Sequence, residues 1–325
     1  MISIIIPYYN PDSSGVLDDL LERAVNSVIC ELKNFRPFEV IVVDDGSKTS
    51  PKHITDKFNT DDVRLITRSH GCLGAARNTG IANSKGDIIL FLDADDYYFP
   101  NTLADCIDYF EKRDADLLMF DMKKCYSDKV ERVIITSHFS RMTTGDRFMQ
   151  SHNLKGSSCS FIISKKLIDR HHLRFVENTF IEDEEYTSRM VFYSKRFITT
   201  CRYVYAYYQR RDSIINSNGY SDIENRSQCT LNILRRLVEF RDLHCNEEHT
   251  GLDRKINTLA LDHIRRTLRR DDWKESIIIH KTTLSTLGLF PLKNGRNSIR
   301  YNFYKLLSRN NIGLSLLHLI EKSRL

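Results

Sequence analysis

The first half of the chain alternates short apolar runs with longer segments in which apolar residues recur every three or four positions. From Leu17 to Leu32 the apolar residues fall on one helical stripe, and Gly74–Ser84 is also expected to be a helix. The apolar runs have the length of strands and lie at Ile2–Pro7, Glu39–Val43, Val63–Thr67, Asp87–Leu92 and Leu117–Phe120. Short buried strands separated by helices predict an α/β fold with a mostly parallel sheet that is covered on both faces.

After about residue 125 the alternation becomes less regular. We expect a strand at Ser160–Ile163, a helix at Asp183–Tyr193 and a strand at Tyr203–Tyr208. Beyond that last strand the pattern is helical to the end of the sequence. These patterns predict an α/β catalytic domain over residues 1–215 and a helical, basic C-terminal region over residues 216–325.

Charge is distributed unevenly between these two parts. The net charge of the chain is +5, but residues 251–325 alone carry 15 Lys and Arg against 6 Asp and Glu. Four arginines of this stretch lie beside apolar residues at helical spacing and predict a basic amphipathic helix: Arg265, Arg266, Arg269 and Arg270. Two explanations stay open, because such charge either attracts an anionic partner such as a membrane surface or forms a solvated helical face.

The compartment is suggested by what the sequence lacks. No window approaches 18 continuous apolar residues, and the opening residues have neither the basic start nor the cleavage site of a signal peptide. The eight cysteines lie far apart with no CxxC pair, which favours a reducing compartment over a disulfide framework or a zinc site. We therefore expect a cytoplasmic protein, either free or peripheral on the inner face of the membrane, without a nucleic-acid partner.

Acidic residues gather where the predicted strands end. Asp44 and Asp45 follow the second strand, and Asp93 and Asp95 follow the fourth. In an open parallel sheet, ligands bind beyond the carboxyl ends of the strands. Carboxylates held together there are costly unless a cation joins them, and Mg²⁺ or Mn²⁺ takes phosphate oxygens as its other ligands. The run Asp93-Ala94-Asp95 therefore predicts a metal–diphosphate site, although a short D-x-D also occurs in solvated loops.

Four motifs follow one another in a specific order. They are SIIIPYYN at Ser3–Asn10, VDDGS at Val43–Ser47, GAARNTG at Gly74–Gly80 and LDADD at Leu92–Asp96. Together they resemble the inverting glycosyltransferases of family two, which have the GT-A nucleotide-sugar-binding, Rossmann-like fold. The resemblance is dense over residues 1–100 and thinner over residues 155–215.

The resemblance implies a role for each matching donor-site residue. Pro7 and Tyr9 would line the base and ribose, with the Tyr9 ring available for stacking. Asp45 would accept a hydrogen bond from the N3–H of uracil, and Arg77 would lie near the base and diphosphate. Asp44 and Gly46 are better explained by turn chemistry.

The same resemblance assigns the D-x-D run. Asp93 would contact the ribose, Ala94 would lie against the nucleotide sugar, and Asp95 would bind Mn²⁺ or Mg²⁺ directly. The metal would offset the charge that develops on the departing diphosphate. The basic run at Arg210 and Arg211 could add a cation for the leaving group, or be an ordinary surface loop.

An inverting transfer needs one base to take the proton of the attacking hydroxyl. In the family this base comes from a Glu-Asp pair that opens a helix, which here corresponds to Glu182 and Asp183. The resemblance makes Asp183 the general base and Glu182 a neighbouring or acceptor-binding residue. The residues alone also allow an acidic first turn that complements the helix dipole.

The departures from the family pattern favour addition of a single sugar. Processive members carry Gln-x-x-Arg-Trp, but Gln209 is followed here by Arg-Arg-Asp, and the single tryptophan is Trp273. The resemblance implies a hexosyl- or N-acetylhexosaminyltransferase that uses a UDP-sugar. The acceptor would be a glycan or a polyprenyl-diphosphate-linked intermediate in assembly of a bacterial surface polysaccharide, such as O-antigen or capsule. Two alternatives remain: a catalytically degenerate binding or scaffold subunit, and a nucleotidyltransferase, which usually has a Gly-rich loop that this first strand lacks.

Overall fold

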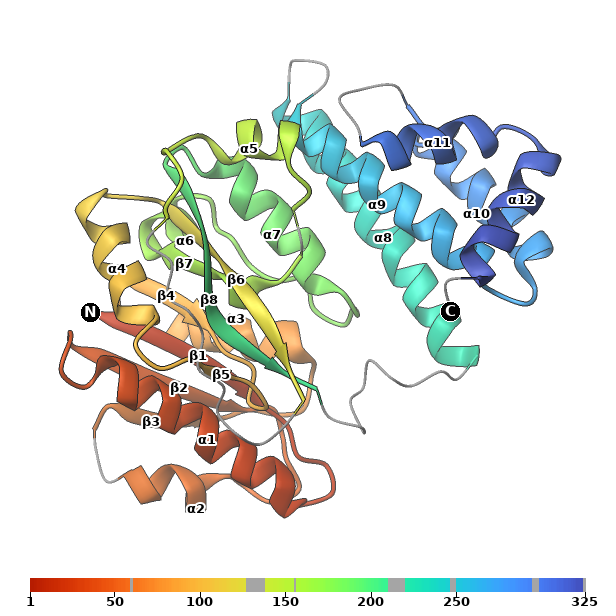
Figure 1. Ribbon diagram of the computed structural model, residues 1–325. Coiled ribbons are helices and arrows are strands. Elements are labelled where there is room, and N and C mark those ends of the chain that lie inside the picture. The colour runs from red at the N-terminus through yellow and green to blue at the C-terminus, as the bar shows by residue number, and fades with distance from the viewer. Residues whose placement is uncertain are drawn as a thin grey trace. The chain divides into compact units, whose positions relative to one another are not determined.

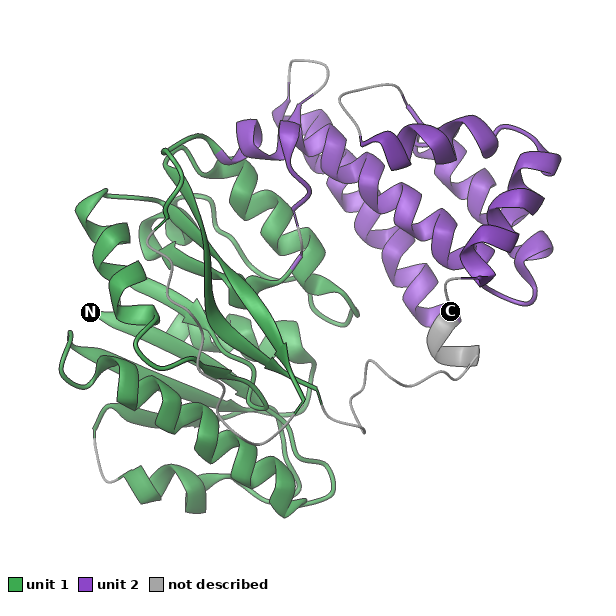
Figure 2. Cartoon of the chain, viewed as in Figure 1, with its two compact units in different colours: residues 1–144, 157–217 green, residues 145–156, 218–325 purple. Residues whose placement is uncertain are grey.

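The chain divides into two compact units, which are described separately here (Figure 2). The computed structural model describes residues 1–58, 61–126, 138–154, 156–209, 220–245, 250–293 and 298–323. Unit 1 comprises Met1–Thr144 and Ser157–Ser217, and unit 2 comprises Gly145–Gly156 and Asn218–Leu325. The assignment of catalysis to residues 1–215 and of a separate basic region to residues 216–325 stays a prediction.

Unit 1 is built on one sheet, whose strand order in the described part of the chain is β3-β2-β1-β4-β7-β6-β8-β5 (Figure 1). β3, β2, β1 and β4 are parallel, as are β6 and β8, whereas β7 is antiparallel to both neighbours and β5 is antiparallel to β8. The strands are β1 Ile2–Tyr8, β2 Phe38–Asp44, β3 Val63–Thr67, β4 Ile88–Phe91, β5 Tyr97–Tyr98, β6 Leu117–Cys125, β7 Phe161–Ser164 and β8 Phe197–Tyr208.

The predicted α/β fold with a mostly parallel sheet is confirmed. Every residue of β1 and β2 is buried, so both faces of the sheet are covered there. The main difference concerns β8, which begins at Phe197 rather than Tyr203. The helices of this unit are α1 Gly15–Leu32, α2 Lys52–Thr55, α3 Leu73–Asn83, α4 Leu103–Lys112, α6 Lys165–Arg170 and α7 Glu182–Tyr193, with 3-10 turns at Asp56–Phe58 and Ser158–Ser160.

Helix α3 lies unusually close to strand β1. A Cβ atom added at Gly80 of α3 would lie 2.3 Å from Cγ2 of Ile5, which is fully buried. Only a residue without a side chain lets the α3 backbone pack this closely against the Ile5 side chain. The contact therefore positions α3 against β1.

We predict that Gly80→Ala lowers the free energy of unfolding. Overpacking a filled core typically costs about 1–3 kcal/mol, which exceeds the gain of up to about 1 kcal/mol in helix propensity. Gly15→Ala is the matched control, since no atom lies within 4 Å of the Cβ position at Gly15. The thermal unfolding midpoint should fall for Gly80→Ala only, and equal midpoints for both variants would contradict the close packing.

Unit 2 is helical within its described residues. Its helices are α5 Gly145–Ser151, α8 Tyr220–His244, α9 Gly251–Leu268, α10 Trp273–Thr286, α11 Ile299–Leu307 and α12 Asn311–Lys322. Helix α9 packs against all the others and starts with a capping box, in which Thr250 and Asp253 satisfy each other's backbone N–H groups. Its apolar face is buried, and no helix in the described ranges is long and apolar enough to cross a bilayer.

The predicted basic helix is present, but most of its charge is used inside unit 2. Arg265 and Arg269 both pair with Glu321 of α12, at 2.8 and 2.6 Å, and Arg270 pairs with Asp272 and Glu224. The Glu321 side chain is 0% exposed and also accepts a hydrogen bond from Tyr304. Burial alone would raise its pKa, but the bonds from Arg265, Tyr304 and Arg269 lower that pKa to about 2.

We predict that Glu321→Gln destabilises the protein in a pH-dependent way. Because the folded pKa lies below the unfolded pKa, the carboxylate contributes its full stability above pH ~5 and loses it as the pH falls towards 2. The free energy of unfolding of the variant should be lower than that of wild type by about 3 kcal/mol at pH 7 and by roughly half of that at pH 3. Thermal unfolding at the two pH values measures this, with the exposed Glu239→Gln as control. A loss that is equal at both pH values would contradict the ion-pair explanation.

Candidate active site

The predicted site residues of unit 1 lie where the parallel strands end. Strands β1, β2, β3 and β4 all point their carboxyl ends to one edge of the sheet, because they are parallel to one another. The loops that follow them carry Tyr9, Asp45, Arg68 and Asp93. This edge is where open α/β sheets bind ligands.

The Asp45 carboxylate is buried beside the loop that follows β3. It accepts hydrogen bonds from Arg68 and from the backbone N–H of Gly71, at 3.2 Å, and Nδ1 of His70 lies 3.2 Å from it. Sequence analysis missed Arg68 and His70, although they follow a parallel strand and the strand-end argument applies to them equally. The turn chemistry expected for the preceding residues is confirmed, since Asp44 accepts the N–H of Ser47 and Gly46 has a φ of +77°.

An aromatic platform lies beside this carboxylate. The ring of Tyr9 stacks on His70 with a centroid distance of 4.2 Å and an interplanar angle of 23°, and Tyr9 remains 41% exposed. Pro7, in contrast, is buried within β1, opposite Val43. Contact of Tyr9, Pro7 and Asp45 with a nucleotide base stays a prediction.

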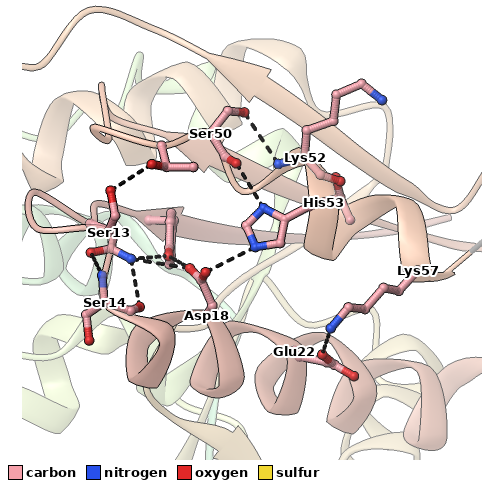
Figure 3. Close-up of polar contacts among 12 residues, drawn as sticks. Ser13, Ser14, Asp18, Glu22, Ser50, Lys52, His53 and Lys57 are labelled. Carbon is pink, nitrogen blue, oxygen red and sulfur yellow. Dashed lines mark hydrogen bonds and ion pairs between the residues drawn. The ribbon is translucent and has the colours of Figure 1, made fainter.

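Two loops of this edge are joined by a polar network that the sequence did not reveal (Figure 3). Asn10 donates to Tyr8 and to the carbonyl of Ser14, and its own N–H donates to Ser47. Asp18 of α1 accepts a hydrogen bond from the Tyr8 hydroxyl at 2.5 Å, and its carboxylate lies 3.1 Å from His53 of α2. This carboxylate therefore links α1 to β1 and to α2. Burial and the bond to Asp18 raise the pKa of Tyr8, which therefore stays a donor. The network links the loops that carry Tyr9 and Asp45.

The D-x-D run forms a tight turn after β4. The third aspartate, Asp96, is buried and accepts hydrogen bonds from the Tyr205 hydroxyl at 2.5 Å and the Tyr208 N–H at 2.7 Å. Burial, and then the charges of Asp95 and Asp93, raise its pKa well above the ordinary value. Asp96 therefore anchors the turn to β8, while Asp93 and Asp95 remain partly exposed at the edge of the sheet.

A divalent cation fits this turn only if a ligand supplies most of its coordination. The described residues hold no group of three His, Cys, Asp or Glu side chains that could bind a metal by themselves. Mg²⁺ and Mn²⁺ commonly use one or two carboxylates and take water and substrate phosphates for the rest. Asp95, beside carboxylates that repel one another, is the chain's candidate ligand.

Arg77 of α3 joins the D-x-D turn to the start of α7. Its guanidinium is 1% exposed and donates to Asp93 at 2.8 Å, to Glu182 at 2.9 Å and to Asp183 at 3.0 Å. Burial opposes the charge on Arg77, but Asp183 and Asp93 raise the pKa of the guanidinium well above its ordinary value. Arg77 thus lies between the D-x-D turn and the predicted general base. Its expected place near the base and diphosphate stays a prediction.

Asp183 is the more accessible carboxylate of the pair that opens α7. Its side chain is 22% exposed, against 7% for Glu182. Burial raises the pKa of Asp183, Asp93 raises it further, and Arg77 opposes both effects. The pKa of Glu182 is raised as well, chiefly by burial. Just before the pair, Ile181 has a φ of +64°, a conformation that β-branched residues rarely adopt outside functional sites.

Helix α3 also holds the segment that leads into α7. The Asn78 side chain accepts the N–H of Phe175 at 2.8 Å and donates to its carbonyl at 3.0 Å. Asn78 therefore takes the place of a backbone hydrogen-bonding partner for Phe175, a buried loop residue. Arg210 and Arg211, the predicted leaving-group cations, lie outside the described residues.

Comparison with known proteins identifies the family. The family model described as Glycosyl transferase family 2 matches residues 3–173, just over half of the chain. The chain therefore belongs to family 2 of the glycosyltransferases, and the nucleotidyltransferase alternative is wrong.

Two of the similar curated proteins are named as poly(ribitol-phosphate) glycosyltransferases. Poly(ribitol-phosphate) beta-N-acetylglucosaminyltransferase TarS of Staphylococcus aureus is 26% identical over 227 residues, which is 69% of this chain and 38% of that protein. Poly(ribitol-phosphate) beta-glucosyltransferase of Bacillus spizizenii is 25% identical over 229 residues, covering 69% of this chain and 34% of that protein. The chain thus spans little more than a third of either relative.

Among solved structures, the fold is similar to that of S. aureus TarS 1–349 in complex with UDP-GlcNAc. The TM-score is 0.69 at 18% sequence identity, and the match covers 99% of this chain and 91% of that chain. At this identity the likeness establishes the fold, which confirms the predicted GT-A type of architecture with C-terminal helices.

We predict that Asn78→Ala loosens the segment before α7. The Phe175 N–H would lose its acceptor in a buried place, at an expected cost of about 1–2 kcal/mol. Hydrogen exchange should become faster for Phe175 and its neighbours up to Ile181, but not in the sheet. Asn83→Ala removes an exposed bond of the same helix and serves as the control. Unchanged exchange before α7 would show that Asn78 does not hold it.

Proposed function

We propose that the chain transfers a single hexosyl or N-acetylhexosaminyl group from a UDP-sugar to a hydroxyl acceptor, with inversion at the anomeric carbon. One observation carries the proposal: Arg77 holds Asp183 and Asp93 in one cluster. A carboxylate suited to take a proton thus lies next to the motif that would hold the donor. Family membership and the fold of a UDP-GlcNAc-bound relative support this choice.

Donor binding would use the edge formed by Asp45, Tyr9 and His70. A carboxylate can accept about four hydrogen bonds, so Asp45 can take the uracil N3–H in addition to its bonds from Arg68 and Gly71. The exposed Tyr9 ring, supported from behind by His70, would stack on the base. Pro7 would line the bottom of the base-binding site, and Asp93 and Ala94 would contact the ribose and the sugar.

The leaving diphosphate would be held at the D-x-D turn. Asp95 would ligate Mn²⁺ or Mg²⁺, and the bound metal would supply the positive charge that stabilises departing UDP. A structural neighbour, a mannosyltransferase from Pyrobaculum calidifontis, was solved with GDP-Man and Mn²⁺ (TM-score 0.51, 14% identity). Arg210 and Arg211 are proposed to add positive charge for the leaving group.

The protein's own part in the chemistry is to move one proton. The acceptor oxygen bonds to the anomeric carbon while the bond to the UDP oxygen breaks, and Asp183 takes the acceptor's proton. One displacement of this kind inverts the configuration. Burial raises the pKa of Asp183 and makes it a stronger base, while Arg77 keeps it ionised. Glu182, buried against the same guanidinium, would orient Arg77 and border the acceptor.

The setting is inferred from the relatives, whose names describe transfer to poly(ribitol-phosphate). We propose a glycan or polyprenyl-diphosphate-linked acceptor in bacterial surface polysaccharide assembly, at the cytoplasmic face of the membrane. The chain's own sugar and acceptor would be set by residues beyond the proton-transfer cluster.

We predict that Asp183→Asn abolishes transfer without abolishing donor binding. The expected fall in kcat is about 10²–10⁴-fold, because proton transfer typically contributes that much. Asp95→Asn should instead weaken Mn²⁺-dependent binding of UDP. Transfer and hydrolysis are measured with UDP-glucose, UDP-galactose and their N-acetyl forms, and UDP binding by calorimetry.

Glu184→Gln, which changes the neighbouring carboxylate, is the matched control and should keep full activity. If wild type binds UDP but neither transfers nor hydrolyses any donor, the chain is the degenerate binding subunit. If Asp183→Asn keeps its activity, the assigned base is wrong.

A further inference from the structure

The outer sides of α11 and α12 expose large apolar side chains in a regular pattern. Three lie at i, i+4 and i+7 of each helix, so each set forms one stripe. Ile299 and Ile312, the first of each stripe, are 90% and 85% exposed. We name these residues the α11–α12 apolar face: Ile299, Phe303, Leu306, Ile312, Leu316 and Leu319.

These side chains are not the core of the helical unit. The opposite sides of the two helices are buried through Tyr301, Tyr304, Leu314 and Leu317. Helices α11 and α12 contact each other and α9 with these inner sides. The apolar face is therefore additional to what folding of the unit requires, and exposed apolar side chains gathered in this way often mark an interaction surface.

Basic side chains outnumber acidic ones around the face, although Lys322 pairs with the exposed Asp271 at 2.7 Å and Arg300 lies 3.6 Å from Glu321. Residues 298–323 contain four basic side chains, and their single acidic residue, Glu321, is fully buried in its ion pairs. Arg309 is exposed between the two stripes along the chain. Arg265, Arg269 and Arg270, by contrast, are engaged with Glu321, Asp272 and Glu224. Within the described residues of unit 2, α11 and α12 therefore combine exposed apolar side chains with a net positive charge.

We propose that the α11–α12 apolar face docks on an anionic lipid bilayer. Interfacial helices bury one apolar side at the headgroup boundary and place basic residues near anionic lipid, which matches this face. A second copy of the chain would bring two cationic surfaces together, which electrostatic repulsion disfavours. The inference deepens the proposed function, since a lipid-linked acceptor would be reached from such a surface.

Vesicle co-sedimentation of the full chain, without donor or acceptor, tests the docking. Wild type should bind vesicles of phosphatidylcholine and phosphatidylglycerol, and bind pure phosphatidylcholine vesicles and high-salt samples more weakly. Ile299→Ser, Ile312→Ser and Leu316→Ser combined should lower binding at least roughly tenfold. Arg309→Glu should weaken binding to the anionic vesicles only.

The matched control is Leu243→Ser, which removes an equally exposed apolar side chain at the end of α8. It should bind as wild type does, and circular dichroism checks that each variant is folded. Equal binding by wild type and the triple variant would overturn the proposal. A different result would also overturn it: wild type is a dimer in light scattering and does not bind vesicles, and the triple variant is a monomer. Because no turnover is measured, loss of the proposed transferase activity would leave this result unaffected.

Discussion

One buried guanidinium connects the two halves of the candidate active site. Arg77 faces three carboxylates, from the D-x-D turn and from the start of α7, at distances of 2.8 to 3.0 Å. Without this cation the three carboxylates would repel one another, and Glu182 would be left buried without a partner of opposite charge. Its position depends in turn on the close approach of α3 to β1 at Gly80. The geometry of the site therefore follows from backbone packing in the core.

The two units use buried ion pairs for different purposes. In unit 1 Arg77 contacts Asp183, which is partly accessible, and the raised pKa of Asp183 suits proton transfer. In unit 2 the carboxylate of Glu321 is closed off by Arg265, Arg269 and Tyr304, and its pKa is lowered to about 2. The cluster around Arg77 keeps the Asp183 carboxylate basic, whereas the cluster around Glu321 holds α9, α11 and α12 together.

Local patterns predicted the features that are local in the sequence. The strands β1 to β4 and the turn at Asp93–Asp96 follow from apolar runs and the residues that end them. The pairing of Arg77 with Asp183 joins residues that are 106 positions apart, and that of Arg265 with Glu321 joins residues 56 apart. No periodicity reports such contacts, so the arginines of α9 resembled a solvent-facing basic stripe. Arg68 and His70 could have been found, because they follow a parallel strand as the other loop residues do.

The central claim is that Arg77 sets the protonation of Asp183, and the pH dependence of kcat/KM tests it most directly. The acid limb of this profile reports the ionisation of the base in the free enzyme. In Arg77→Gln the cation that lowers the pKa of Asp183 is gone, so the midpoint of the acid limb should move to higher pH, with Arg77→Lys in between. If both variants fold and the midpoint of their acid limb equals that of wild type, Arg77 does not set the protonation of Asp183, whatever the maximal rate of the variants.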